Sequence, residues 1–178
     1  VPTTSEFLKT SLTTLLAALL MFAANPLFAQ DAVPESAPEQ KESGWEIDTW
    51  SIQTSLYTYH FDPDPDHVND QNLIGIEAGF KNRWLAGVAV FDNSFGQSSQ
   101  LIYAGYYWPI YGSDYWYFKL MGGLLHGYKE PYEDKIPLNS LGVAPAIVPA
   151  LGFRYKYFVT ELNLGGLAVV TLTAGIKF

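Results

Sequence analysis

The stretch LAVVTLTAGIKF, residues 167–178, alternates between apolar and polar side chains over most of its length. Successive side chains of a β-strand point to opposite faces, so this period of two predicts an amphipathic strand with one face in an apolar environment. The apolar face carries Val170, Leu172, Ala174, Ile176 and Phe178, and the other face carries Thr171, Thr173 and Lys177.

Seven further segments precede this one, each near the roughly 9–11 residues that a tilted transmembrane strand needs, and turn residues separate them. No stretch after Gly44 is apolar over a length that spans a bilayer as a helix. An even number of strands can close without an exposed edge, which lipid requires. We therefore predict an all-β fold, an eight-stranded antiparallel up-and-down transmembrane β-barrel, with strands near residues 47–61, 73–80, 84–92, 100–109, 115–127, 146–155, 158–164 and 168–178.

The composition, with many aromatic and few charged residues, suggests an interface with lipid or carbohydrate. Charged residues make up 16% of the chain, against roughly 25% in a typical soluble domain, and the chain has 12 Tyr, 11 Phe and 5 Trp. Aromatic clusters at residues 106–108 and 114–118 fit a girdle at a membrane interface. The 18 acidic residues outnumber the 10 basic ones, which speaks against binding to nucleic acid. The absence of cysteine excludes disulfides and thiolate chemistry.

The N-terminal part has the layout of a targeting segment. Lys9 precedes an apolar core over residues 12–24, and small residues end at Ala29. This pattern predicts a cleaved signal peptide over residues 1–29, with an uncleaved anchor helix as the alternative. Residues 30–44 are rich in Pro, Glu and Ser and predict a disordered periplasmic leader. The barrel itself is expected over residues 45–178, in the bacterial outer membrane, where the outer-membrane assembly machinery would insert it.

A periplasmic N-terminus fixes the direction of every strand. Residues 81–83 and 110–114 then form short periplasmic turns, and residues 62–71 and 129–143 form long outer loops, as in known membrane barrels. The final strand ending in Phe178 is similar to the C-terminal signal of bacterial outer-membrane proteins. The alternative for that strand is the ordinary last strand of a soluble, lipocalin-like barrel.

This topology collects reactive side chains at the outer rim. His60 ends the first strand, Asp92, Asn93 and Ser94 end the third, and His126 lies near the end of the fifth. An imidazole with a hydroxyl and a carboxylate is the inventory for acyl transfer, in which the histidine is first base and then acid. The alternative is ordinary turn chemistry, since Asp, Asn and Ser all favour turns.

The loop DPDPDH carries acids at alternate positions, Asp62, Asp64 and Asp66. It is similar to part of a calcium loop but lacks the glycine and the distal glutamate of an EF-hand. A solvated acidic turn is the favoured interpretation. A loop that binds divalent cations bridging lipid A phosphates is the alternative, and we predict no metal site.

Two features concern the inside of the barrel. Residues 120–127, which include Gly122 and Gly123, are apolar on both faces, so an apolar lumen with glycines could hold a single acyl chain. The alternative is a lumen filled by side chains. Pro145 and Pro149 remove ladder donors at the start of the sixth strand, which predicts interrupted pairing. That interruption is either a lateral gap through which a lipid chain enters or a strand that begins only after Pro149.

Taken together, the chain resembles the lipid A palmitoyltransferase (PagP) family. The resemblance covers most of the chain from Trp45 onward and rests on short motifs: YHF at 59–61, F-x-x-S at 91–94, AGYYW at 104–108, IPL at 136–138 before the proline-bearing strand, and the last strand ending in Phe178. It implies an eight-stranded outer-membrane barrel, a monomer without a cofactor, that moves a palmitoyl chain from a phospholipid donor to lipid A.

Carried over from this family, the catalytic residues fall on His60 and Ser94. The family has an aspartate directly before the serine, whereas this chain has Asn93 there and Asp92 one residue earlier. The family also carries an amphipathic helix before the barrel, which residues 31–44 do not show. Two other functions stay open. One is a lipid A deacylase, although its His-x-Ser pair is missing at His126, and the other is a non-catalytic barrel, meaning an adhesin, a structural protein or a narrow carrier.

Overall fold

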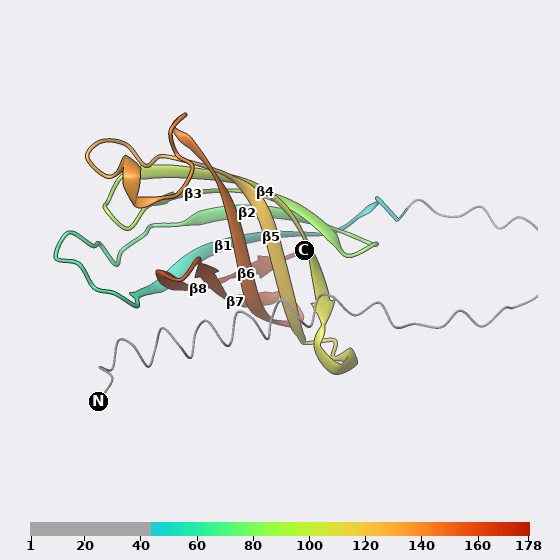
Figure 1. Ribbon diagram of the computed structural model, residues 1–178. Helices are drawn as coiled ribbons and strands as arrows, with labels where there is room; N and C mark the ends of the chain where they lie inside the picture. Colours follow the sequence, from blue (N-terminus) through green and yellow to red (C-terminus); the bar gives the residue numbers. More distant parts are fainter. Residues whose placement is uncertain (1–43) are drawn as a thin grey trace, which may run out of the picture. The chain divides into compact units, whose positions relative to one another are not determined.

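Eight antiparallel strands follow one another around a closed barrel in the computed structural model of the protein (Figure 1). The structure describes residues 44–178, and the predicted signal peptide and nearly all of the predicted leader lie outside these residues. The elements are β1 (Ile47–His60), β2 (Ile74–Phe80), β3 (Trp84–Asp92), β4 (Ser98–Pro109), η1 (Ile110–Gly112), β5 (Trp116–His126), η2 (Glu133–Lys135), β6 (Val143–Tyr155), β7 (Phe158–Gly165) and β8 (Val169–Lys177).

The eight predicted strands are confirmed, and so is the eight-stranded barrel. The largest shift is at β6, which begins at Val143 rather than at residue 146. It begins earlier because β5 pairs with it from Val143 onward, through both prolines. Figure 1 shows the long loops after β1 and β5 at one end of the barrel, where the shorter connections after β3 and β7 also lie, and the turns after β2, β4 and β6 at the other end, as in the predicted topology.

The last strand closes the barrel against the first. β8 pairs with β1 from Ser51↔Lys177 to His60↔Val169, with one irregularity between Ser55 and Tyr57. As the alternation predicts, Thr171 and Thr173 are buried in the lumen, while Ile176 is exposed on the outer surface. No strand of the circuit is left without two neighbouring strands.

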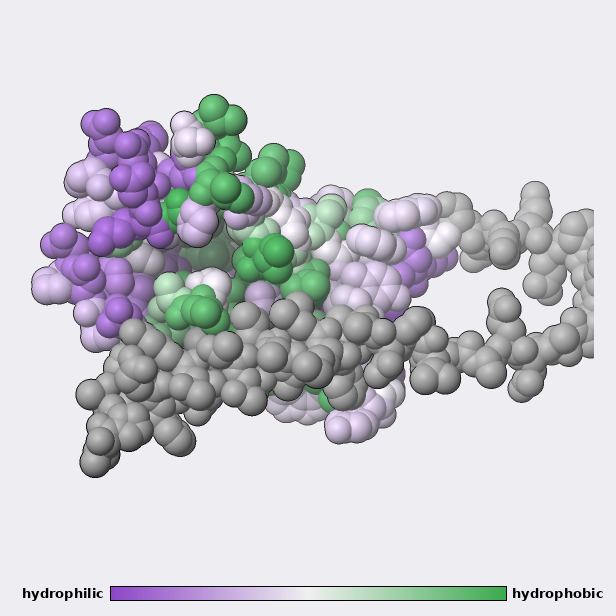
Figure 2. Space-filling model, viewed as in Figure 1, coloured by the Kyte–Doolittle hydropathy of each residue, from purple (hydrophilic) through white to green (hydrophobic). Residues whose placement is uncertain are grey.

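The outer surface of the barrel wall is apolar. Exposed isoleucine, leucine, valine and aromatic side chains occur on the outward face of all eight strands, and Figure 2 shows hydrophilic loops at one end beside a largely apolar wall. Aromatic rings contact one another near the short turns, for example Trp84 with Tyr106 and Trp108 with Phe118. A closed barrel with an apolar outer band and an aromatic girdle is built to lie in lipid, so the protein is a small transmembrane β-barrel of the outer-membrane type.

Within residues 44–178, no helix is both long enough and apolar enough to span a bilayer.

An ion-pair cluster lies across the lumen. Lys119 of β5 is 2% exposed, and its Nζ donates to Glu161 Oε2 at 2.7 Å and to Glu77 Oε2 at 2.9 Å. Two tyrosines complete the cluster, since Tyr117 donates to Glu161 Oε1 at 2.5 Å and Tyr103 donates to Glu77 Oε2 at 3.1 Å. Three strands far apart in the sequence therefore contribute charges that are paired and hydrogen-bonded with one another. The predicted apolar lumen is wrong here, because five polar side chains meet at this level.

Two glycines make room for the tyrosines of the cluster. A Cβ at Gly152 would overlap the ring of Tyr117, and a Cβ at Gly87 would lie 2.5 Å from the ring of Tyr103. Below the cluster, the Arg154 guanidinium lies over the rings of Tyr107 and Tyr117 at 5.0 and 5.5 Å. The lumen is therefore filled toward the short-turn end, which argues against a continuous channel.

We expect Lys119→Met to destabilise the barrel by about 3–5 kcal/mol, because it leaves two adjacent buried carboxylates without a counter-charge. The free energy of unfolding in urea, measured on barrels folded in vesicles, tests this. Lys156→Met, in an exposed turn, is the matched control and should change stability by less than about 0.5 kcal/mol. Adding Glu77→Gln and Glu161→Gln to Lys119→Met should restore much of the loss. Equal stability of Lys119→Met and the control would contradict the role given to the cluster.

Candidate functional site

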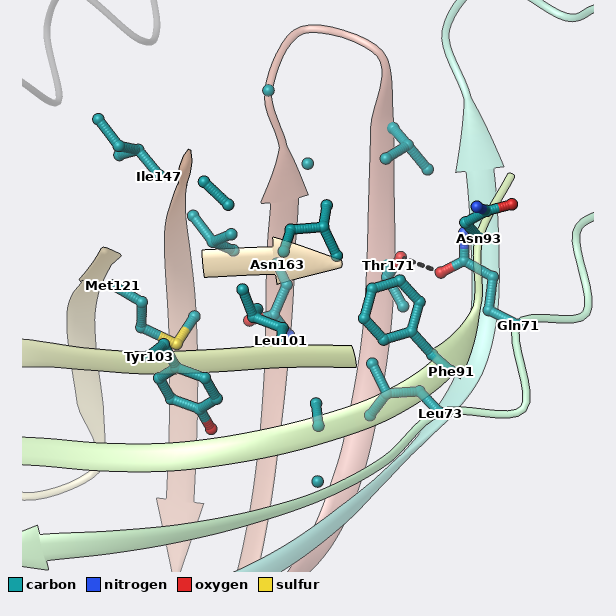
Figure 3. A pocket seen from close by; sticks show the side chains of 18 of the residues that line it. Gln71, Leu73, Phe91, Asn93, Leu101, Tyr103, Met121, Ile147, Asn163 and Thr171 are labelled. Atoms are coloured by element: carbon teal, nitrogen blue, oxygen red, sulfur yellow. Dashed lines mark hydrogen bonds between the residues drawn. The ribbon is translucent and has the colours of Figure 1, made fainter. Parts of the chain in front are cut away.

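A cavity of about 470 Å³ occupies the lumen between the ion-pair cluster and the outer loops (Figure 3). This volume lies within the range of about 300–1,000 Å³ that small-molecule sites occupy. Glu77, Lys119 and Glu161 form part of its lining, and so do Asn93 and Ser94 at the rim. The ion-pair cluster is therefore its floor, and the loop end of the barrel is its mouth.

The wall of the barrel is open beside this cavity. β6 is paired with β5 from His126↔Val143 to Trp116↔Phe153, but with β7 it is paired only from Ala150↔Asn163 to Tyr155↔Phe158. Among the described residues, the stretch 143–149 has no partner strand on its β7 side. The predicted interruption of pairing near the prolines is confirmed, and it affects one edge of β6 only.

The prolines fit this open edge. Residues of equal parity in a strand point their N–H groups to the same neighbour, so Pro145 and Pro149 remove two donors from one edge of β6. The register with β5 continues without a shift across both residues. Proline is tolerated in a sheet where its missing N–H is not needed, which is the edge without a partner strand.

Apolar side chains border the opening on both sides. On the β6 side, Ile147 is 69% exposed, and on the side of the β7–β8 turn Leu167 is also exposed, and both line the cavity. Figure 2 shows a hollow with apolar surroundings on this face, next to the hydrophilic loops. Contact between exposed apolar side chains of this kind and acyl chains is favourable, whereas their contact with water is unfavourable. We call these side chains the apolar lips of the opening.

The predicted substrate-binding residues divide into two groups. Pro145 lines the cavity at the opening, whereas Pro149, Gly122 and Gly123 do not line it. A Cβ at Gly122 would meet open space, while one at Gly123 would meet the backbone of Ile102 and the side chain of the adjacent tyrosine. Gly123 thus allows close approach of β4 and β5, Gly122 has no neighbour that requires a glycine, and neither residue lines the cavity.

His60 is held by a residue that the sequence did not reveal. The ring is 5% exposed, and its Nδ1 lies 2.9 Å from Oδ1 of Asn69 in the loop after β1. When Nδ1 donates to this amide oxygen, Nε2 is the unprotonated nitrogen of the neutral ring. Nε2 is buried and has no hydrogen-bond partner within the described chain. This is the tautomer that a general base needs.

The patch Asp92-Asn93-Ser94 is organised as a turn. Oδ1 of Asn93 accepts the backbone N–H groups of Phe95 at 2.9 Å and Gln97 at 3.1 Å, which is the usual Asn turn. Asp92 accepts a hydrogen bond from Asn72 at 3.0 Å. Neither residue contacts the His60 ring through a hydrogen bond, so the position predicted for the orienting acid is occupied by Asn69 instead.

Ser94 is buried and lines the cavity, but its hydroxyl serves another partner. Burial raises the pKa of Tyr128, and hydrogen bonds from Ser94 act against that rise. His60 is not among the residues that line the cavity. The structure therefore brings His60 and Ser94 to the same rim without joining them, and His126 bonds Gln100 at the outer surface, apart from both. Their catalytic roles stay a prediction.

The loop after β1 is tied to the rest of the rim. The His67 ring stacks on His60 with centroids 4.3 Å apart, and Val68 N–H donates to the carbonyl of Ser94 at 2.8 Å. Phe95 in turn stacks on Tyr132 of the β5–β6 loop at 4.1 Å. The outer loops thus form one connected layer above the mouth of the cavity.

Within residues 44–178, no group of three or more His, Asp or Glu side chains could hold a metal ion. In the acidic loop, Asp64 Oδ1 accepts the backbone N–H of Asp66 at 3.0 Å, and the N–H of Asp64 donates to His67. These bonds are those of a turn.

No protein-family model and no curated protein matches the chain by sequence. Among solved structures, the chain is similar to Ail, the attachment invasion locus protein of Yersinia pestis. A crystal structure of Ail with the heparin analogue sucrose octasulfate shares 15% identity over 73% of this chain and 96% of that chain, with a TM-score of 0.41. A backbone structure of Ail in a phospholipid bilayer nanodisc shares 15% identity over 75% of this chain and 100% of that chain, with a TM-score of 0.42. A de novo designed transmembrane β-barrel shares 12% identity over 76% of this chain and 98% of that chain, with a TM-score of 0.41. Likeness at this level says nothing about what the protein binds, which has to be argued from its own residues.

The loop layer contains a pH-sensitive contact. Burial first, and then the neighbouring His60, lowers the pKa of His67 below its usual 6.5, with Lys135 adding to the effect and Asp64 and Asp62 opposing it. The docked loop therefore favours the neutral ring. The neutral His67 ring contributes fully to the stability of the docked loop above about pH 6.5. This contribution is lost as the pH falls through the lowered pKa of His67.

We expect hydrogen-exchange protection of the Val68 amide, which bonds the Ser94 carbonyl, to fall between neutral pH and about pH 5, after correction for intrinsic exchange. His67→Gln should flatten this dependence. His126→Gln, which removes a rim histidine outside the loop contact, should leave it intact. Protection that does not change with pH in the unmodified chain would rule out the contact as a pH-sensitive element.

Proposed function

We propose that the protein takes up a lipid acyl chain from the outer leaflet through the opening between β6 and β7 and holds it in the lumen. The observation that carries this proposal is the unpaired edge of residues 143–149 next to the cavity. An unpaired strand edge within a membrane wall is costly, because no water replaces its missing partners. Such an edge, bordered by apolar lips, fits a passage for hydrocarbon.

The floor of the cavity supports the same proposal. The cluster of Lys119, Glu77 and Glu161 closes the lumen below, so a molecule inside can exchange only through the side or the mouth. This arrangement suits a binding chamber for one chain and is unsuited to a channel. A small barrel that binds lipid without chemistry satisfies all of these observations.

Lateral entry can be tested with a cysteine, because the chain has none of its own. In Met121→Cys, the thiol lies in the cavity, and we expect the membrane-partitioned reagent N-hexadecylmaleimide to label it faster than a charged, water-soluble maleimide. Ala146→Trp narrows the opening from the β6 side and should slow labelling by N-hexadecylmaleimide about tenfold, which corresponds to about 1.4 kcal/mol. Ala86→Trp, on the lipid-facing side of β3, is the matched control and should not slow it.

Faster labelling by the water-soluble reagent, or equal labelling of the Ala146→Trp and Ala86→Trp barrels, would contradict entry between β6 and β7.

Acyl transfer to lipid A is a second candidate function, and one observation favours it. The Nε2 of His60 is buried and has no hydrogen-bond partner among residues 44–178, while Asn69 fixes the ring through Nδ1. A base held in this way suits the activation of a hydroxyl, with Ser94 or the acceptor lipid supplying that hydroxyl. Asn69 hydrogen-bonds the ring but lacks the charge with which a carboxylate stabilises imidazolium.

If this second function holds, His60→Ala and Ser94→Ala should each lower transfer of a phospholipid chain to lipid A by about a hundredfold or more, the usual scale for a lost general base. Asn93→Asp should preserve or raise the rate if the geometry of the resembled family applies. Mass spectrometry of lipid A, incubated in vesicles with phospholipid and the full chain, measures the product. Fully active alanine variants, with normal barrel mobility on gels, would exclude this chemistry.

A further inference from the structure

One side of the cavity is polar along its depth. On the lumen face of β8, Thr171 and Thr173 lie two residues apart, about 7 Å along the strand. Thr171 Oγ1 donates to Gln71 Oε1 at 3.3 Å, and Thr173 Oγ1 donates to Gln53 Oε1 at 2.9 Å. Asn163 of β7 donates from Nδ2 to Thr173 Oγ1 at 3.1 Å. Figure 3 shows the amide of Gln71 turned toward the Thr171 hydroxyl. We call Gln53, Gln71, Asn163, Thr171 and Thr173 the polar wall.

These bonds leave part of each amide unused. Gln53 Nε2, Gln71 Nε2 and Asn163 Oδ1 have no hydrogen-bond partner among residues 44–178. Gln53 is 8% exposed and Gln71 is 7% exposed, and both line the cavity. If an amide is turned over, its other polar group is the one left free. The polar wall thus presents unpaired hydrogen-bonding groups to the cavity at two depths.

The opposite side of the cavity is apolar. Phe91, Leu101, Met121 and Leu125 line it from β3, β4 and β5, and Val148 lines it beside the opening. Figure 3 labels the first three of these side chains. A molecule that fills the cavity therefore meets hydrocarbon along one edge and amides and hydroxyls along the other. A plain alkyl chain would match the first edge, but it would displace water from the second and leave the amides unpaired, which is unfavourable.

We propose that the cavity selects an acyl chain that carries a hydroxyl group within its buried length over the unsubstituted chain of the same length. This inference rests on the proposed uptake of a chain, because the ligand reaches the polar wall by the same opening. A hydroxyl can donate to the Asn163 oxygen and accept from a glutamine amide, so it satisfies the groups that the polar wall leaves free. The two depths allow the hydroxyl to lie near the middle of the chain.

Displacement of the fluorescent fatty acid cis-parinarate from the full chain in vesicles measures this selectivity. We expect 12-hydroxystearate to displace the probe at about one tenth of the concentration that stearate requires, the effect of one net hydrogen bond. Gln53→Met and Gln71→Met keep the length of the side chain and remove the amide, and at least one of them should abolish the preference. Gln100→Met, on the outward face of β4, is the matched control and should keep it.

The outcomes separate this inference from the function on which it rests. Equal displacement by stearate and 12-hydroxystearate overturns the selectivity and leaves chain uptake standing. A preference that survives in both Gln53→Met and Gln71→Met overturns the assignment to the polar wall. Failure of cis-parinarate to bind at all overturns chain uptake and the selectivity with it. The comparison of the two acids on the unmodified chain needs no variant to fold.

Discussion

A strand edge inside a bilayer has no water to pair with, and this constraint decides where the protein can and cannot be open. The barrel meets the constraint by closing β8 on β1 over nine paired residues, from Ser51↔Lys177 to His60↔Val169. β2 stops short of the outer end of β1, so residues 56–60 of β1 have no partner strand on that side, and the loop bonds β1 there only at Ser55, through Leu73. The longer unpaired edge is that of β6 toward β7, over residues 143–149, and it lies next to the cavity. The placement of both prolines and the apolar side chains at the opening fit this unpaired edge of β6.

The ion-pair cluster is the counterpart of the opening. Burying Lys119 between Glu77 and Glu161 is tolerable because every charge has a partner and the tyrosine hydroxyls take further acceptor positions. The cluster joins β2, β5 and β7 at one level of the lumen and forms the floor of the cavity. A barrel without the ion-pair cluster would have to fill this level of the lumen with apolar side chains. The polar wall would then have apolar groups below it as well as on the opposite side of the cavity.

The strands and their inward faces could be predicted because the period of two is a local property of the sequence. Thr171 and Thr173 therefore lie in the lumen as expected. The cluster was missed, although each of its charges is a single ionisable residue within a segment assigned to the membrane. Such residues are expected to face the interior and to pair with one another, so Glu77, Lys119 and Glu161 carried a usable signal.

The rim was only half predictable. Topology brings His60 and Ser94 to one end of the barrel, because both follow outward-running strands. The hydrogen-bond partner of His60 depends on the path of the loop after β1, whose sequence has no hydrophobic period from which that path could be predicted. Nothing in the stretch HVNDQ, residues 67–71, singled out Asn69. Turn chemistry, in contrast, was visible in Asn93, whose side-chain oxygen accepts two backbone N–H groups.

The state of the rim also separates the two candidate functions by what each requires. Uptake of a chain needs the opening and the cavity, and both are present with the loops docked. Transfer of that chain needs Ser94 to leave Tyr128, or an acceptor hydroxyl to enter beside Nε2 of His60, which the stacked His67 covers on one face of the ring. The loop of residues 61–73 carries both His67 and Asn69. The element that would expose the base is therefore also the one that orients it. Catalysis on this rim would have to be coupled to movement of the loop, whereas binding in the lumen does not depend on it.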